Sequence, residues 1–464
     1  MLKKPWSLGV LTLAAIVLIV LIFVFRPDHT LRVVTGVVAH DMCSKTFTSG
    51  LDPQSIMAET MTRSGISRLK WLISYQVDRT HRTVSAAFAG LLRSRALFRD
   101  GLGCVLVHQA LAPVAIDVAS TAPAATAAAL LPSIAGPAIV APSSELLRQA
   151  LDHAFEEPPS PPLRRTKAVV IVAEGRVIGE RYAPGIGIDT PLMGFSLTKS
   201  VVNALLGVLV QQGRLTPSQP APIAEWQAPS DPRRAITIEH LMRMSSGLAL
   251  DETNTGFDVS SRMLYLYDDM AAFAAKAPLI ATPGTRWAYS SPSTVLLSRI
   301  IGETLGGRPE ETLAFARRHL FQPLGIQDVT LEFDAAGTFI GNSYAFASAR
   351  DWARLGLLYL NDGEIAGQRL LPPGWVEFSA RATLGMYYAA GFWTLRSEHP
   401  WAKRWAELGI PGDAFFGSGD LGQRLVILPT QRLIVVRLGD AVDQTGDMRG
   451  LARLIREVLA ATMP

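Results

Sequence analysis

The apolar and polar positions of this chain divide it into segments, and the most apolar segment comes first. No charged residue lies between Lys4 and Arg26. A run of about 20 apolar residues is long enough to cross a bilayer as a helix, and the lysines before it predict a cytoplasmic amino terminus with export of the remainder. The run ends in bulky residues at 23–25, which favours an uncleaved anchor over a cleaved signal peptide. We predict a transmembrane anchor or signal peptide at residues 1–27.

The next segment, residues 28–108, is mixed in character. Its apolar spacing indicates helices around residues 66–77 and 85–98. Residues 100–107 begin with Asp-Gly and continue into an apolar run, which predicts a turn followed by a short strand. We therefore expect a small N-terminal accessory region here.

Residues 109–143 differ sharply from both neighbours. Asp117 is the only charged residue between Gln109 and Ser144, and Ala and Pro dominate the composition. Recurrent prolines break any long helix, so this stretch does not have the pattern of a second membrane span. We predict an extended linker that lies on the main domain.

The remainder, residues 144–464, has the pattern of one large domain. A helix is predicted at its start with Ser144 as N-cap, and an amphipathic helix is predicted at its end. Between them the pattern predicts a hairpin at 168–182 turning at 174–175, a buried helix from Ser196 to about Gly213, and a hairpin at 419–438 turning at 429–431. Strands thus open and close the domain and helices fill its middle. This order favours an α+β fold, in which terminal helices flank an antiparallel sheet that carries a helical subdomain.

Charge and cysteine content narrow the functional class. The net charge is only +4 and no long basic block occurs, which argues against nucleic-acid binding. The two cysteines, Cys43 and Cys104, both lie in the accessory region. In an exported chain an even count suggests one disulfide, the alternative being two buried thiols. His40 beside Cys43 provides too few ligands for a metal site.

The candidate chemistry centres on Ser196 and Lys199 at the start of the predicted buried helix. Positions i and i+3 share one helix face, so the hydroxyl and the amine can touch. A serine becomes a strong nucleophile when a neighbouring base takes its proton, and a desolvated lysine can be that base. The same spacing occurs at Ser67 and Lys70, in a basic stretch typical of an exposed helix.

Two later segments contain possible partners of this serine. Tyr289 lies just before a predicted helix that Ser291 would cap, and a tyrosine hydroxyl there could relay protons. Gly417, Ser418 and Gly419 lead into the last hairpin, where small residues would let a substrate lie along a strand edge. The Ser418 N–H could pair with the Ser196 N–H as an oxyanion hole, or the segment could be a plain glycine-rich turn.

One further segment, residues 238–248, has the pattern of a short helix capped by Gly247, and we expect it to form a structural corner.

Taken together, the segments at 196–199, 240–248, 283–291 and 416–423 occur in an order that resembles the serine β-lactamase-like hydrolases. This family includes class C β-lactamases, related esterases and penicillin-binding proteins, and the most similar subgroup is the exported proteins related to 6-aminohexanoate-dimer hydrolase. The resemblance covers residues 144–464. It implies that no metal or cofactor is needed.

The resemblance also implies a role for each site residue. Ser196 would be the nucleophile, Lys199 the base or pKa tuner, and Tyr289 the proton shuttle, with the amides of Ser196 and Ser418 as the oxyanion hole. The sequence departs from the family at Asp420, where a basic residue or His is common, and at Ser291, where Asn is common. We expect these two residues, with Gly417, Ser418 and Gly419, to bind the substrate.

These observations predict a membrane-anchored, exported serine hydrolase that cleaves amide or ester bonds in a small or short peptide-like substrate. It would face the periplasmic or extracytoplasmic side of the inner membrane. The departures at Asp420 and Ser291 favour this activity over a true β-lactamase or D-Ala carboxypeptidase. A catalytically weak or inactive binding protein on the same scaffold, at the cell envelope, is the non-enzyme alternative. No G-x-S-x-G segment with strand–turn–helix context is present, which argues against an α/β-hydrolase.

Overall fold

The computed structural model describes residues 27–63, 66–108, 112–114, 128–253, 256, 258–443 and 445–462. The predicted membrane anchor at residues 1–26 lies outside this set. Among the described residues, no helix combines the length and the apolar character that crossing a bilayer requires.

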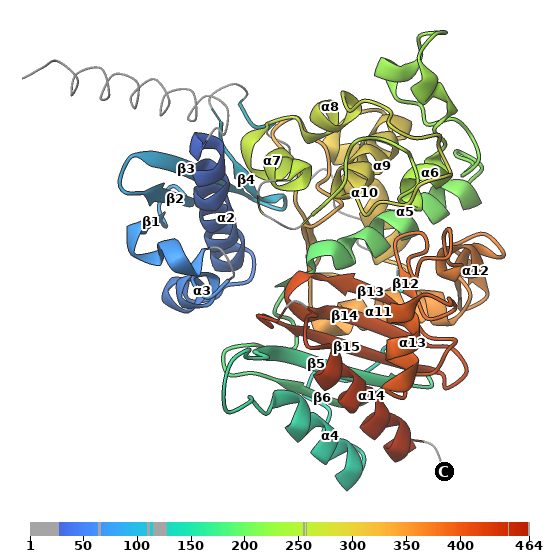
Figure 1. Cartoon of the computed structure of the whole chain (residues 1–464). Coiled ribbons are helices and arrows are strands. Elements are labelled where there is room, and N and C mark those ends of the chain that lie inside the picture. Colours follow the sequence, from blue (N-terminus) through green and yellow to red (C-terminus); the bar gives the residue numbers. More distant parts are fainter. Residues whose placement is uncertain are drawn as a thin grey trace, which may run out of the picture.

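Strands cluster near the start and the end of the described chain, and helices dominate its middle (Figure 1). The α-helices are α2 (Pro27–Phe47), α3 (Pro53–Thr60), α4 (Glu145–Phe155), α5 (Thr198–Gln211), α6 (Ile238–Met242), α7 (Val259–Leu266), α8 (Met270–Ala275), α9 (Ser291–Thr304), α10 (Pro309–Ala316), α11 (Ala349–Leu360), α12 (Trp375–Ala380), α13 (Pro400–Glu407) and α14 (Met448–Thr462). The strands are β1 (Ile73–Asp78), β2 (Thr83–Phe88), β3 (Leu92–Arg99), β4 (Gly103–Leu106), β5 (Thr166–Ala173), β6 (Arg176–Tyr182), β7 (Leu192–Met193), β8 (Thr330–Leu331), β9 (Ala345–Ala347), β10 (Glu364–Ile365), β11 (Gln368–Arg369), β12 (Trp393–Thr394), β13 (Phe415–Gly419), β14 (Gln423–Leu428) and β15 (Leu433–Gly439). Short helical turns are η1 (Ser67–Leu72), η3 (Phe195–Leu197), η4 (Ala224–Trp226), η5 (Pro232–Ala235), η6 (Arg317–Phe321) and η7 (Asp420–Gly422).

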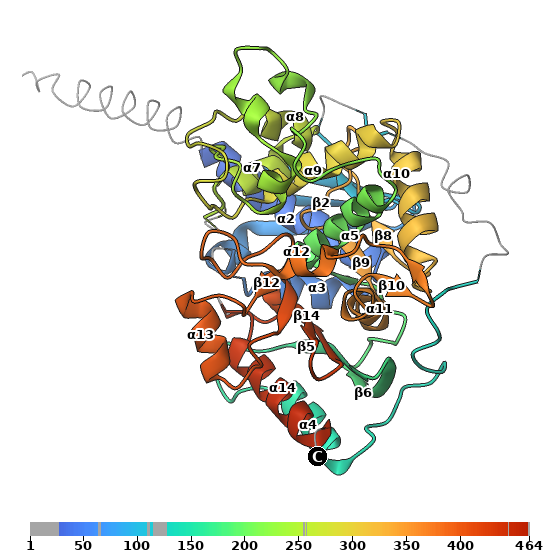
Figure 2. The same ribbon diagram turned by 90° about the vertical axis from the view of Figure 1, so that its right-hand side faces the viewer.

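The centre of the main domain is an antiparallel six-stranded sheet in the order β12-β13-β14-β15-β5-β6. Strand β5 is buried on both faces, because Val169 and Ile171 pack with helices α4 and α14 while Val170 and Val172 pack with the larger core on the other side. Figure 2 shows α4 and α14 together on their side of this sheet. The predicted α+β arrangement with flanking terminal helices is confirmed.

Several predicted elements match the structure closely. Ser144 caps α4 by accepting a hydrogen bond from the Leu147 N–H at 3.2 Å. Strands β5 and β6 turn at Glu174 and Gly175, both with positive φ, as a two-residue hairpin of this twist requires. The last hairpin and the last helix also fall where predicted. The helix at 238 is shorter than expected, because α6 ends at Met242 and Gly247 (φ 75°) belongs to a later turn.

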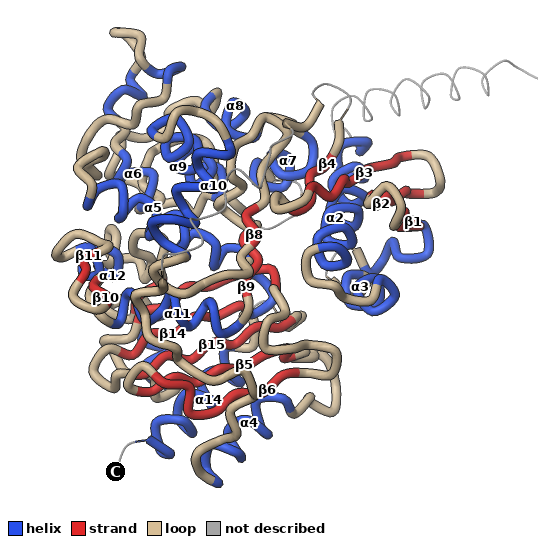
Figure 3. Tube along the Cα trace, turned by 180° about the vertical axis from the view of Figure 1, so that it is seen from behind, coloured by secondary structure: helices blue, strands red, loops and turns tan. Residues whose placement is uncertain are grey.

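In the N-terminal unit, described over residues 27–63 and 66–106, α2 packs on the four-stranded sheet β1-β2-β3-β4, and α3 and η1 lie between α2 and β1 in the sequence (Figure 3). The two helices predicted at 66–77 and 85–98 are wrong, because apart from the turn η1 these residues form strands. Strand β3 shows the reason. Exposed Arg93 and Arg95 alternate with less exposed neighbours at a period of two, which is the strand pattern. The disulfide prediction is confirmed, since Cys43 of α2 bonds to Cys104 of β4.

The N-terminal unit docks on the main domain through buried charges. The Glu332 carboxylate accepts hydrogen bonds from the Cys104 N–H and the Ser44 hydroxyl, each at 2.8 Å. Asp440, at the end of β15, pairs with Lys45 of α2 at 3.2 Å and with Lys167 of β5 at 3.0 Å. These pairs are hydrogen-bonded and shielded from water, so they hold the unit in one position.

The described end of the predicted linker, residues 128–143, lies on the main domain without forming a helix or strand. Its Ile134 carbonyl accepts from the Val177 N–H at 2.9 Å, and the Ser143 N–H donates to the Ile178 carbonyl at 3.0 Å. This part of the linker therefore runs along edge strand β6.

Candidate active site

The central feature of the site is the turn that carries Ser196. Phe195 adopts a left-handed backbone conformation with φ 46°, which is strained for a bulky residue. This conformation turns the chain sharply after β7. The chain then enters η3 and continues directly into α5, whose first three turns are almost entirely buried. Ser196 thus stands, half-buried, at the first turn of a core helix, as predicted.

Lys199 lies one turn further along the same face and reaches back to Ser196. Its Nζ lies 2.9 Å from Ser196 Oγ. The amine also donates to Ser291 Oγ and to the Asn342 carbonyl, both at 3.1 Å. The Lys199 side chain is therefore buried among three oxygen atoms, one of which is the hydroxyl of the predicted nucleophile.

The environment of Lys199 sets its protonation. Burial lowers the pKa of this amine to about 8, while the negative charge of Glu252 works in the opposite direction. A lysine in water has a pKa near 10.4. The amine can therefore be neutral, and able to accept a proton, close to physiological pH.

Tyr289 lies in the turn before α9, against the same amine. Lys199 Nζ is 4.9 Å from the centroid of its ring, and Trp393 stacks on the ring at a centroid distance of 5.6 Å. Burial raises the pKa of Tyr289 well above its ordinary value, with the charge of Glu252 acting in the same direction and a hydrogen bond with Ser196 acting against it. Tyr289 is therefore a neutral hydroxyl in contact with Ser196.

Ser291 has a different role from the predicted helix cap. Ser290 is the N-cap of α9, because its Oγ accepts a hydrogen bond from the Ser293 N–H at 3.2 Å, and Pro292 occupies the second helical position. The hydroxyl of Ser291 is thereby free to accept from Lys199. The capping prediction was wrong by one residue. Ser291, also predicted as a substrate-binding residue, lies beside Lys199.

Strand β13 packs against the turn that carries Ser196, and its glycines permit a close approach. A Cβ on Gly417 would lie 2.3 Å from Leu197 Cδ1, and one on Gly419 would lie 2.1 Å from the Gly194 carbonyl oxygen. Gly419 is thus required for β13 to pack against the turn that carries Ser196, because its Cβ would meet backbone. At Gly417 the side chains of Leu197 and Ser200 would have to move.

The backbone of Ser418 faces the unpaired side of this strand. The Leu395 N–H donates to the Ala414 carbonyl, so the polar groups of residues 414, 416 and 418 point away from β14 by the alternation of an antiparallel ladder. Strand β12 pairs only with Phe415 and Phe416. The Ser418 N–H therefore lies beyond the end of β12, on the side of the strand where a substrate could align.

Asp420 lies at the exposed end of β13, where η7 begins. One carboxylate oxygen accepts from the Leu421 N–H at 2.9 Å. Its negative charge contributes to raising the pKa of Tyr289 and of Arg63. Asp420 therefore acts on the site through charge and does not join the contacts around Lys199.

Two polar residues of the site had no counterpart in the predicted motifs. The Glu252 carboxylate accepts from the Ser291 N–H at 2.9 Å and from the Ser260 hydroxyl at 3.0 Å, which holds the start of α9 in place. Asn203 lies one turn after Lys199 on α5 and bonds to the Ala390 carbonyl at 2.6 Å. A single amide in an otherwise apolar run was a usable signal for Asn203. Glu252 lies in a loop without any pattern.

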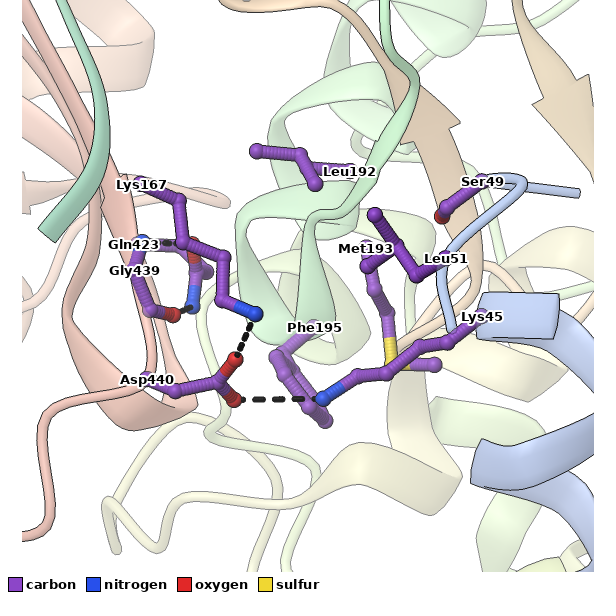
Figure 4. A pocket seen from close by; sticks show the side chains of 10 residues that line it. All are labelled: Lys45, Ser49, Leu51, Lys167, Leu192, Met193, Phe195, Gln423, Gly439 and Asp440. Atoms are coloured by element: carbon purple, nitrogen blue, oxygen red, sulfur yellow. Dashed lines mark hydrogen bonds and ion pairs between the residues drawn. The ribbon is translucent and has the colours of Figure 1, made fainter. Parts of the chain in front are cut away.

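A pocket lies behind the turn that carries Ser196, between the N-terminal unit and the sheet (Figure 4). Phe195 and Leu51 provide its apolar wall, and Lys45 and Lys167 point toward Asp440 across it. The charged groups pair with one another, so this pocket is part of the interface between the N-terminal unit and the main domain. Within the described residues, no group of three or more His, Cys, Asp or Glu side chains could hold a metal ion.

The comparison with known structures supports the fold. A Bacillus anthracis protein assigned as a 6-aminohexanoate-dimer hydrolase aligns with a TM-score of 0.55 and 20% identity, over 73% of this chain and 88% of that one. A family VIII carboxylesterase aligns with a TM-score of 0.54 and 17% identity, over 70% of this chain and 98% of that one.

The sequence comparisons address the family. A curated relative, the 6-aminohexanoate-dimer hydrolase of Paenarthrobacter ureafaciens, is 24% identical over 293 residues, which cover 60% of this chain and 73% of the relative. Residues 162–460 match the family model described as Beta-lactamase, which is more than half of the chain. Together with the buried Ser196–Lys199 contact, this match shows that the chain belongs to the β-lactamase family of serine hydrolases.

Proposed function

We propose that this protein is a membrane-anchored serine hydrolase that cleaves amide or ester bonds through an acyl-enzyme on Ser196. The observation that carries the proposal is the 2.9 Å contact between Ser196 Oγ and the buried Lys199 Nζ. A buried amine with a lowered pKa beside a half-buried hydroxyl is the arrangement that activates a serine. The alternative copy, Ser67 and Lys70, lies on the short turn η1, which has no buried residue.

Acylation follows from this geometry. The neutral Lys199 amine takes the Ser196 proton while Oγ attacks the substrate carbonyl. The carbonyl oxygen becomes an oxyanion that accepts hydrogen bonds from the N–H groups of Ser196 and Ser418. The leaving amine or alcohol departs with a proton that the neutral Tyr289 hydroxyl delivers, and Tyr289 recovers a proton from the Lys199 ammonium. The acyl group then remains on Ser196 as an ester.

Deacylation uses the same groups in the reverse sense. A water molecule loses its proton toward Tyr289 and Lys199 as its oxygen attacks the acyl carbon. The ester bond breaks, Ser196 Oγ regains a proton, and the acid product leaves. Glu252 remains hydrogen-bonded to the start of α9 during the cycle. Its negative charge favours the protonated form of Lys199.

The substrate class that we propose is a small or short peptide-like amide or ester. Asp420 places a negative charge where β-lactam-recognising relatives carry a basic residue, which disfavours a carboxylate-bearing β-lactam or D-Ala peptide. The name of the curated relative, 6-aminohexanoate-dimer hydrolase, supports a small dimeric amide. The half-buried side chain of Trp393, which stacks on Tyr289, offers apolar surface for such a chain.

The location that we propose is the extracytoplasmic face of the inner membrane. The apolar run between Lys4 and Arg26 supports an anchor, and the Cys43–Cys104 disulfide supports an oxidising compartment. Membrane fractionation followed by amino-terminal sequencing tests this part. Loss of residues 1–26 from the mature chain would refute the anchor.

The test of the proposed activity is covalent labelling with a serine-directed fluorophosphonate. Wild type and Ser67→Ala should label equally, and Ser196→Ala should not label. Absence of label on wild type would instead favour the inactive binding protein. A panel of p-nitrophenyl esters, ω-amino acid dimers, nitrocefin and D-Ala-D-Ala peptides then ranks the substrates, and rapid nitrocefin turnover would contradict our preference against a β-lactamase.

A further inference from the structure

The N-terminal unit exposes two large apolar side chains at one of its ends. Among the described residues, Leu91 and Trp71 are the most exposed large hydrophobic residues, at 83% and 77%. Leu91 lies in the turn between β2 and β3, and Trp71 lies in η1. The two segments are neighbours, because the Ala89 N–H donates to the Leu72 carbonyl at 2.7 Å.

Unpaired cations surround these two side chains. Arg68 and Lys70 are exposed on η1, and Arg93 and Arg95 are exposed on the outer face of β3. Within the described chain none of these four side chains forms an ion pair. The cross-strand neighbours of Arg93 and Arg95 are Ala87 and Ser85, so no acidic residue faces them across the ladder. We call this set the basic rim; it consists of Arg68, Lys70, Trp71, Leu91, Arg93 and Arg95.

The basic rim lies close to the amino-terminal end of helix α2. Ser94, next to Arg93 on β3, shares a hydrogen bond of 2.8 Å with Thr35, which lies in the first part of α2. The start of β3 and the turn before it therefore lie at the amino-terminal end of α2. Helix α2 begins at Pro27, directly after the predicted membrane anchor.

We propose that the basic rim rests on the membrane surface and binds anionic phospholipid headgroups, with Trp71 and Leu91 entering the interfacial layer. Tryptophan favours the membrane–water interface, and cations close to an anionic bilayer are attracted to it. This inference relies on the proposed anchoring only for the orientation of the unit. The rim provides a second membrane contact, which fixes how the site faces the bilayer.

The test uses the full chain reconstituted in vesicles of phosphatidylcholine alone or with phosphatidylglycerol. Leu91→Cys provides a thiol for a fluorophore, because Cys43 and Cys104 are bonded and buried. The matched control is Leu146→Cys on α4, an exposed leucine on the helix that flanks the six-stranded sheet of the main domain. We expect lipid-borne nitroxide to quench the fluorophore at 91 several-fold more than at 146, and only when phosphatidylglycerol is present.

Charge reversal at the basic rim distinguishes binding of anionic lipid from mere closeness of residue 91 to the bilayer. Arg93→Glu with Arg95→Glu should abolish the quenching at 91, and the exposed pair Arg234→Glu with Arg449→Glu should leave it unchanged. Equal quenching at 91 and 146, or quenching that does not depend on phosphatidylglycerol, would overturn the proposal. The basic rim would then be assigned to binding a protein partner. Fluorophosphonate labelling of the same samples reports the proposed activity separately. Flotation with anionic but not neutral vesicles would refute the anchor while supporting the rim.

Discussion

The Nζ atom of Lys199 lies 2.9 Å from the Oγ atom of Ser196, at the start of a helix whose residues are almost all buried. The amine is surrounded by oxygen atoms and shielded from water, so its pKa and the reactivity of the serine depend on each other. This relationship makes the site sensitive to pH, to nearby charge and to the position of β13.

The first prediction concerns pH. Since burial lowers the pKa of Lys199 to about 8, the amine is charged and unable to accept a proton well below this pH, and neutral above it. For an ester substrate, kcat/KM should rise about tenfold per pH unit below about pH 7 and level off above about pH 8. Steady-state rates across this range measure the profile. A flat profile would contradict the assignment of Lys199 as the base.

The second prediction concerns Glu252, whose charge raises the pKa of Lys199. Glu252→Gln keeps an oxygen that can accept from the Ser291 N–H but removes the charge. The rising limb of the pH profile should move to lower pH, on the order of half a unit. Glu407→Gln, an exposed change on α13, should leave the limb in place. A shift of the rising limb toward higher pH would contradict the conclusion that the charge of Glu252 raises the pKa of Lys199.

The third prediction concerns the close approach of β13. A Cβ on Gly419 would lie 2.1 Å from the Gly194 carbonyl oxygen, which is a backbone atom, so Gly419→Ala must displace the strand from the turn that carries Ser196. Loss of the Ser418 donor should lower kcat on the order of 10²–10³-fold, the effect of removing one oxyanion-hole donor. Gly412→Ala is the matched control, because a Cβ there meets nothing within 4 Å. Equal activity of the two variants would argue against the proposed oxyanion hole.

The fourth prediction concerns Asp440, which joins the N-terminal unit to the sheet. Asp440→Asn leaves the buried Lys45 without its carboxylate partner, whereas Lys167 keeps its ion pair with Glu59 at 2.8 Å. Removing one partner of a buried pair costs about 3–5 kcal/mol of the free energy of unfolding. Denaturant unfolding measures the loss, with the exposed Asp189→Asn as control. A loss of unfolding free energy no larger than that of the control would mean that the ion pairs of Asp440 do not stabilise the fold.

The fourth prediction also fixes how the effect of Asp440→Asn depends on pH. Burial works to raise the pKa of Asp440, but Lys45 and Lys167 lower it below its ordinary range. A lowered carboxylate pKa stabilises the fold above the unfolded value of about 3.9, and this stabilisation is lost as pH falls further. The stability difference between wild type and Asp440→Asn should therefore shrink below about pH 4. A difference that grows in acid would contradict the pairing.

The fifth prediction concerns the disulfide. Cys43 and Cys104 are 61 residues apart, and a cross-link that closes a loop of this length stabilises a fold by about 4 kcal/mol in the chain-entropy model. The double variant Cys43→Ser, Cys104→Ser should lose about this much of the free energy of unfolding. Denaturant unfolding of oxidised wild type and the double variant tests it, and equal midpoints would contradict it.

Sequence patterns predicted the parts of the fold that depend on local chemistry. The hairpin at Glu174 and Gly175 and the cap at Ser144 are set by turn and capping preferences within a few residues, and the buried helix after Ser196 is set by its apolar run. The order of motifs was enough to choose Ser196 over Ser67.

The remainder depends on contacts that local patterns do not record. Strand β3 looked helical because its partly apolar residues can be fitted to either period, and the packing of α2 decides between them. The N-cap fell on Ser290 and not Ser291, since two adjacent serines have equal capping propensity. Glu252 comes from a loop, and only the folded chain brings it to Ser291.

The most direct test of the account is to trap the acyl-enzyme. Wild type, Ser196→Ala and Ser67→Ala are mixed with a p-nitrophenyl ester, quenched in acid and analysed by intact mass and peptide mapping. We predict one acyl group on the peptide that contains Ser196 in wild type and in Ser67→Ala, and none in Ser196→Ala. An acyl group on another residue, or on Ser196→Ala, would contradict the assignment of the nucleophile.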